Sequence, residues 1–145
     1  MMWRYLIAAM AVAYGSLTMS GEAQTADLSK QEPIKVVVQL GTESGRLAFK
    51  PNRLRFETGK LYKLVLQNPS GVKHYFSALQ FASAVWTRKV ETDQAEIKGA
   101  IREIELKPGG QAEWFFVPVQ AGIFDFGCTI ADHSEASMIG KITVM

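Results

Sequence analysis

Short stretches in which hydrophobic and polar residues alternate recur along most of the chain and are separated by turn residues. The strand-like runs are 34–40, 54–56, 61–67, 74–78, 101–106, 112–119, 123–128 and 138–144. Strong turn signals stand between them, as in Asn68-Pro69-Ser70-Gly71 and Lys107-Pro108-Gly109-Gly110. Alternation with a period of two is typical of strands that bury one face. The pattern predicts an all-β sandwich or barrel of seven to eight strands.

One segment, residues 79–99, departs from this pattern. Its first part, 79–86, is rich in alanine and is expected to form a short helix. The charged part that follows is expected to be an exposed flap or hairpin. The fold class is therefore a β-sandwich with a short helical and flap insertion.

The N-terminus has the features of a secretory signal peptide. Arg4 precedes an apolar run over 5–14, and the small residues Gly21 and Ala23 frame a cleavage site after Ala23. The run is short for a membrane span, which needs about 20 residues; an uncleaved N-terminal anchor is the alternative. We expect a signal peptide at 1–23, a flexible lead at 24–33 and one domain at 34–145. The mature protein should be periplasmic, without stable membrane insertion.

Composition and charge exclude several function classes. The net charge is only +2 and there is no basic run, so the chain is not expected to bind nucleic acid. A single Cys excludes an intrachain disulfide and a zinc site with several Cys ligands. A lone Cys in an exported protein is unusual, because a free thiol there is open to oxidation.

That cysteine belongs to the central motif of the sequence. Cys128, His133 and Met138 are spaced as Cys-x4-His-x4-Met between two predicted strands, and His74 begins a strand far upstream. Two imidazoles, a thiolate and a weak thioether are the ligand set of a copper ion that cycles between Cu(I) and Cu(II). Every Cys and His of the predicted mature chain belongs to this set. We expect His74, Cys128, His133 and Met138 to bind one copper ion.

With these residues in place, the sequence resembles the cupredoxins, the small blue copper proteins of the plastocyanin and azurin type. The resemblance lies in 68–74 (NPSGVKH), 121–128 (AGIFDFGC) and the stretch from His133 to Val144. It implies a Greek-key β-sandwich, and it implies one-electron transfer between larger redox proteins. It also implies that His133 is the electron port near the surface. Many family members have Asn after the first ligand histidine, where this chain has Tyr75.

The leading hypothesis is a type 1 copper protein that carries single electrons and has no enzymatic activity. Its partners would be redox proteins such as a cytochrome or an oxidase, and we expect it to act as a monomer. The main alternative is a copper-homeostasis protein that binds or delivers copper in the same site. A Cys–His nucleophilic enzyme using Cys128 and His133 and a metal-free interaction module are weaker alternatives.

Overall fold

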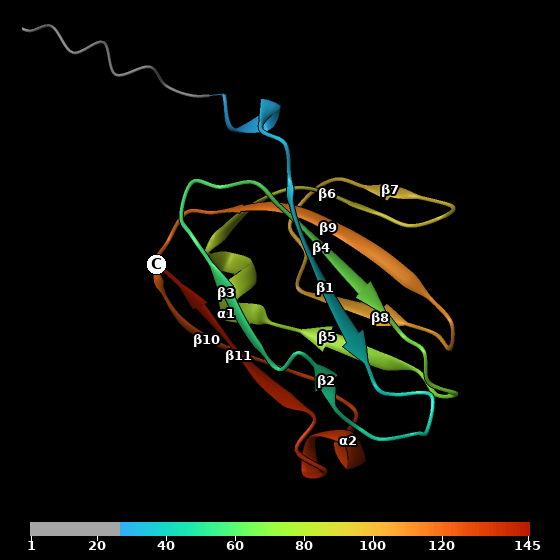
Figure 1. Ribbon diagram of the computed structural model, residues 1–145. Coiled ribbons are helices and arrows are strands. Elements are labelled where there is room, and N and C mark those ends of the chain that lie inside the picture. Colours follow the sequence, from blue (N-terminus) through green and yellow to red (C-terminus); the bar gives the residue numbers. More distant parts are fainter. Residues whose placement is uncertain (1–26) are drawn as a thin grey trace, which may run out of the picture.

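Two mixed β-sheets pack face to face in the computed structural model, which describes residues 27–145 (Figure 1). The first sheet has the strand order β2 (Phe49–Lys50), β1 (Ile34–Leu40), β4 (Tyr62–Gln67), β9 (Gln111–Pro118), β6 (Val85–Glu91) and β7 (Glu96–Ile97). The second has the order β3 (Arg53–Phe56), β11 (Ile139–Val144), β10 (Gly122–Gly127), β5 (His74–Ser77) and β8 (Glu103–Leu106). The described residues also contain a 3-10 turn, η1, and two five-residue helices: η1 (Leu28–Lys30), α1 (Leu79–Ser83) and α2 (Ala131–Glu135).

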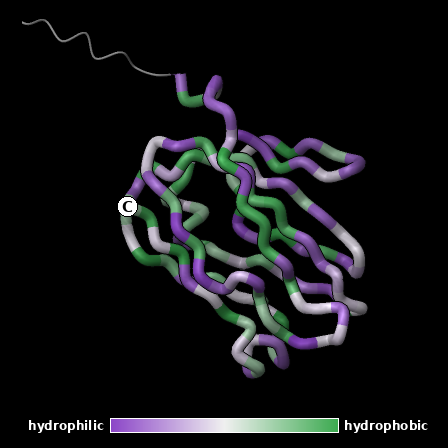
Figure 2. Tube along the Cα trace, in the orientation of Figure 1, coloured by the Kyte–Doolittle hydropathy of each residue, from purple (hydrophilic) through white to green (hydrophobic). Residues whose placement is uncertain are grey.

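The predicted all-β sandwich is confirmed, and its connectivity agrees with a Greek key. The pairs β1–β4 and β3–β11 are parallel, whereas the other pairs along both sheets are antiparallel. The strands follow the alternation seen in the sequence, since β3 buries Leu54 and Phe56 and exposes the two arginines of the strand. Figure 2 shows the same change between hydrophilic and hydrophobic positions along the strands.

Aromatic rings fill the space between the sheets. Phe116 of β9 meets Phe56 and Phe81 edge to face, with ring centroids 5.2 and 5.3 Å apart, and Trp114 lies 4.9 Å from Phe116. All four side chains are buried. Such packing resists displacement because interiors are as dense as organic crystals. The core therefore provides a rigid support for the loops at its ends.

The segment 79–99 differs in part from the expectation. The predicted short helix is present as α1, but residues 85–91 form the strand β6, which pairs with β9 in the first sheet. Val90 is buried at this pairing, so the strand gains a hydrophobic contact that its charged neighbours conceal in the sequence. The β6–β7 hairpin lies at the end of the sandwich away from α2 (Figure 1).

The described residues begin within the predicted flexible lead. The predicted signal peptide, residues 1–23, lies outside the described residues. Within the described part of the predicted flexible lead, Gln31 is held by two hydrogen bonds: its Nε2 donates to the Gly59 carbonyl (3.1 Å) and its Oε1 accepts from the Leu61 amide (3.2 Å). Over residues 27–145, no helix has the length and apolar character needed to cross a membrane.

Candidate metal centre

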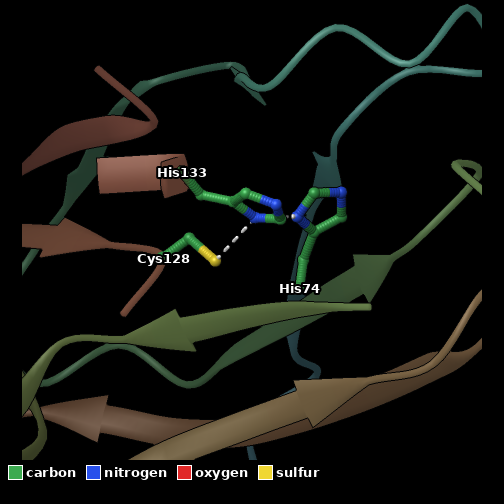
Figure 3. A group of neighbouring side chains, drawn as sticks. All are labelled: His74, Cys128 and His133. Atoms are coloured by element: carbon green, nitrogen blue, oxygen red, sulfur yellow. Dashed lines mark hydrogen bonds between the residues drawn. The ribbon is translucent and has the colours of Figure 1, made fainter. Parts of the chain in front are cut away.

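Three of the predicted ligands meet at one end of the sandwich (Figure 3). His74 is the first residue of β5, Cys128 follows the last residue of β10, and His133 lies in α2. The possible ligand atoms of the three side chains all lie within 4.8 Å of one another. The Nδ1 atoms of the two histidines are 3.1 Å apart, and Cys128 Sγ is 3.4 Å from His133 Nδ1. Within 27–145, no other group of three His, Cys, Asp or Glu side chains is placed to hold a metal.

The pairing of neighbouring strands positions Cys128. Gly127, the last residue of β10, pairs with Ser77 of β5 on one side and with Ile139 of β11 on the other. Directly beyond it, the Cys128 amide donates to the Met138 carbonyl (3.1 Å). The Tyr75 amide donates to Cys128 Sγ (3.4 Å), and the thiol is buried. The backbone therefore fixes the position of the sulfur at the end of β10.

The connecting loop presents His133 through a short helix and a tight reversal. The His133 amide donates to the Ile130 carbonyl, which opens α2, and the Met138 amide donates back to the His133 carbonyl (both 3.0 Å). Ser137 has a positive φ of 63°, which turns the chain toward Met138. This places His133 on the same side as Cys128. Its side chain is only partly buried, unlike those of the other two candidate ligands.

His74 is completely buried, and its environment keeps it neutral. Burial, with a further contribution from neighbouring His133, lowers the pKa of His74 below its ordinary value. A neutral imidazole is the form that binds a metal, so protons compete weakly at this position. Its Nε2 lies 2.9 Å from the Ser70 hydroxyl, and its Nδ1 faces the other candidate ligands.

Met138, the fourth predicted ligand, is placed at the end of the same loop. Its side chain is fully buried, and its backbone is hydrogen-bonded to both Cys128 and His133. This position is compatible with the predicted weak axial contact. The role of the Met138 thioether as a ligand stays a prediction.

The donor set fits copper by its chemistry. One thiol and two imidazoles converge without a carboxylate in the group, which disfavours the hard cations Ca²⁺ and Mg²⁺. Thiolate and imidazole together suit a copper ion in either oxidation state. The residues present therefore match the copper predicted from the sequence.

Sequence reasoning missed the residues that surround these ligands. Asn68 and Ser70 were recognised as part of a turn and of the stretch that carries the resemblance, but without a role at the site; both are buried, and Ser70 links Asn68 to His74. Gly41, at the end of β1, approaches the His74 ring so closely that a Cβ there would lie 2.5 Å from Nε2. Tyr75 was noted as an unusual residue, but the hydrogen bond from its backbone amide to the Cys128 thiol depends on the pairing of strands. The signal available in the sequence was an Asn six residues and a Ser four residues before the candidate ligand His74.

The fold and donor set define a small copper-binding β-sandwich protein. The model of the family "Copper binding proteins, plastocyanin/azurin family" matches residues 36–145. The chain belongs to this plastocyanin/azurin family, which confirms the predicted cupredoxin resemblance and copper as the cofactor.

Individual relatives come from bacteria and plants. The "Copper-resistant cuproprotein CopI" of Rubrivivax gelatinosus is 30% identical over 118 residues, which cover 79% of this chain and 67% of that protein. Plastocyanin of Mercurialis perennis is 32% identical over 110 residues, covering 74% and 97%. The solved structure of auracyanin A, a "blue" copper protein from Chloroflexus aurantiacus, has a TM-score of 0.53 at 20% identity and covers 79% of this chain and 100% of that one. At this identity, the structural likeness supports the fold alone.

The close approach of Gly41 to His74 gives a testable prediction. In Gly41→Ala, the new methyl group would meet Nε2 at 2.5 Å and Ser70 Cβ at 3.0 Å, in a backbone conformation with a φ of +77°. We expect His74 to move and the Cu(II) affinity to fall by at least about 10-fold. A competitive Cu(II) titration measures this loss.

Gly45→Ala is the matched control for the backbone cost. Gly45 has a similar φ of +82°, but a Cβ there would meet nothing within 4 Å. Gly45→Ala should lose about 1 kcal/mol of unfolding free energy in urea denaturation of the metal-free protein. Gly41→Ala should lose this backbone cost and more, because its methyl group also meets the buried ring. Only Gly41→Ala should lose copper affinity; equal affinities for the two variants would contradict the proposed contact.

Proposed function

We propose that this protein is a periplasmic type 1 copper protein that carries single electrons between redox partners such as a cytochrome or an oxidase. The observation that carries the proposal is the convergence of His74, Cys128 and His133 within 4.8 Å at the end of a rigid sandwich. Copper bound there would supply the one-electron couple between Cu(I) and Cu(II). The periplasmic location in this proposal follows from the predicted signal peptide. We expect the protein to meet its redox partners as a monomer.

The chain's own residues favour electron transfer over substrate turnover. His74 begins β5 and Cys128 directly follows β10, the neighbouring strand of the same sheet; both side chains are buried, and the Tyr75 amide donates to the thiol. A ligand frame held in this way has little freedom to rearrange, which suits a site that must keep one geometry in two oxidation states. The Cys128 side chain is only 2% exposed, so a substrate has little access to the sulfur, which disfavours a Cys–His nucleophile.

His133 is the ligand that a partner would approach. It is half-buried, whereas the other two candidate ligands are buried. It lies in α2, which projects at the end of the sandwich (Figure 1). The electron would therefore enter and leave through this imidazole, in agreement with the role that the family resemblance implies.

The visible spectrum of the protein loaded with Cu(II) tests the proposal directly. Residues 24–145 should give an intense thiolate-to-copper band at about 600 nm (a blue site), or a stronger component at about 450 nm (a green site). Cys128→Ser should abolish the band, because the hydroxyl cannot replace the covalent thiolate donor. Absence of an intense band from the unsubstituted protein would reject the copper–thiolate site.

A copper-handling role is the second candidate, and it is supported by the similarity to a protein named for copper resistance. The two functions differ in the fate of the metal. An electron carrier should pass through repeated cycles of reduction and oxidation, and exchange electrons with a cytochrome, while its copper content stays constant. A delivery protein should release Cu(I) to an acceptor. The copper content of the protein after cycling, measured with and without a Cu(I) acceptor, separates the two functions. We expect the protein to retain its copper in both cases.

The predicted axial role of Met138 is tested by Met138→Leu. Leucine keeps the buried apolar volume but removes the thioether, so the band should remain and the reduction potential should rise. Met145→Leu is the matched control, because this terminal residue is 62% exposed and should leave spectrum and potential unchanged. Complete loss of copper binding in Met138→Leu would contradict a tuning role.

A further inference from the structure

The three buried polar side chains in the described part of the chain form one hydrogen-bonded series. They are Asn68, Ser70 and His74, with exposed fractions of 1%, 4% and 0%. The Ser70 hydroxyl lies 2.7 Å from Asn68 Oδ1 and 2.9 Å from His74 Nε2. A buried polar group is costly unless it is hydrogen-bonded, and here each buried side-chain polar atom of the described residues has a partner.

The number of available hydrogens limits the directions that these bonds can take. Asn68 Nδ2 donates to the carbonyls of Val72 (2.7 Å) and Leu106 (3.0 Å), which fixes the side-chain amide with Oδ1 toward Ser70. The single hydroxyl hydrogen of Ser70 has two oxygen acceptors, Asn68 Oδ1 and the Val72 carbonyl (3.0 Å), and His74 Nε2 is a third acceptor only in the tautomer that has no proton there. When the hydroxyl donates to either oxygen, Ser70 Oγ is left as an acceptor for the remaining neighbour, His74 Nε2.

A proton on Nε2 determines the chemistry of the other ring nitrogen. A neutral imidazole has one N–H, so Nδ1 of His74 must then present a lone pair. Nδ1 is the atom that faces the site, 3.1 Å from His133 Nδ1. When the N–H of a ligand histidine donates a hydrogen bond to a neighbouring acceptor, the other ring nitrogen, which binds the metal, becomes more basic.

We propose that Ser70 is a positioning residue of the copper site that selects the Nε2–H tautomer of His74 and strengthens Nδ1 as a donor. A stronger nitrogen donor stabilises Cu(II) more than Cu(I), so the Ser70 hydroxyl lowers the reduction potential. This inference rests on the proposed role of His74 as a copper ligand. Gly41 lies at the same edge of the ring, since a Cβ added there would be 2.5 Å from His74 Nε2 and 3.0 Å from Ser70 Cβ.

The contact of the Ser70 hydroxyl with His74 can be removed without opening the turn that contains Ser70. The Ser70 amide donates to Asn68 Oδ1 (3.0 Å), and Asn68 Nδ2 ties the turn to the Leu106 carbonyl. These bonds remain when Ser70 is replaced by Ala, so the variant removes the contact to His74 while leaving the turn closed. The unfolding free energy of the metal-free variant measures how far that separation holds.

Ser70→Ala is the test. We expect the variant to keep the thiolate-to-copper band, to lose about 10- to 100-fold in Cu(II) affinity, and to have a higher reduction potential because its Cu(I) affinity falls less. Ser83→Ala is the matched control: this exposed hydroxyl donates to the Leu79 carbonyl (3.1 Å) and contacts none of the candidate ligands. Its affinity and potential should equal those of the unsubstituted protein.

A second measurement remains informative if Ser70→Ala folds poorly. Nitrogen-15 NMR of the metal-free, unsubstituted protein should show the proton of His74 on Nε2, in a state where no bound copper imposes that tautomer. A proton on Nδ1, or an unchanged potential and Cu(II) affinity in a Ser70→Ala variant that keeps the band, would overturn the inference. These results differ from failure of the proposed function, in which the unsubstituted protein itself lacks the band.

Discussion

The candidate site depends on the register of three strands at Gly127. This residue pairs with Ser77 and Ile139 at the same time, so β5, β10 and β11 are aligned at the point where Cys128 follows. Side chains of successive strand residues point to opposite faces, and a slip of one residue would exchange the faces. The thiol would then lose its bond from the Tyr75 amide, and the ligand loop would lose the bond from Cys128 to the Met138 carbonyl.

Both sheets contribute to the surroundings of His74. The histidine belongs to β5 of the second sheet, whereas Gly41 follows β1 of the first sheet and lies against the imidazole ring. Asn68 and Ser70 lie in the turn between β4 and β5, which connects the two sheets. The imidazole is therefore enclosed where the sheets meet, and the rigid aromatic core behind them limits its movement. The burial that encloses the ring also lowers the pKa of His74.

Burial divides the candidate ligands between two tasks. His74 and Cys128 lie inside the sandwich and set the geometry of the centre, whereas His133 reaches the surface through α2. A site that turned over a substrate would need a cleft with space beside its reactive atoms. A site that exchanges electrons needs only one ligand near a partner. Two buried ligands and one ligand near the surface suit electron exchange. The same arrangement also suits transfer of the copper ion to another protein, so the two proposed functions are separated by the fate of copper during cycling.

The sequence by itself determined most strands and the local part of the site. Alternation predicts the strands that bury one face, and Cys128, His133 and Met138 can be recognised together because one loop contains them. The charged part after residue 86 was predicted as an exposed flap or hairpin, and the hairpin is present as β6–β7. Charged side chains on either side conceal the buried Val90, so only pairing with β9 made 85–91 a strand of the first sheet. The contacts of Gly41, Ser70 and the Tyr75 amide were likewise decided by the tertiary structure. These contacts join segments that are brought together by the pairing of strands and by the orientation of the His74 ring. Neither the pairing nor the orientation can be read from the order of residues along the chain.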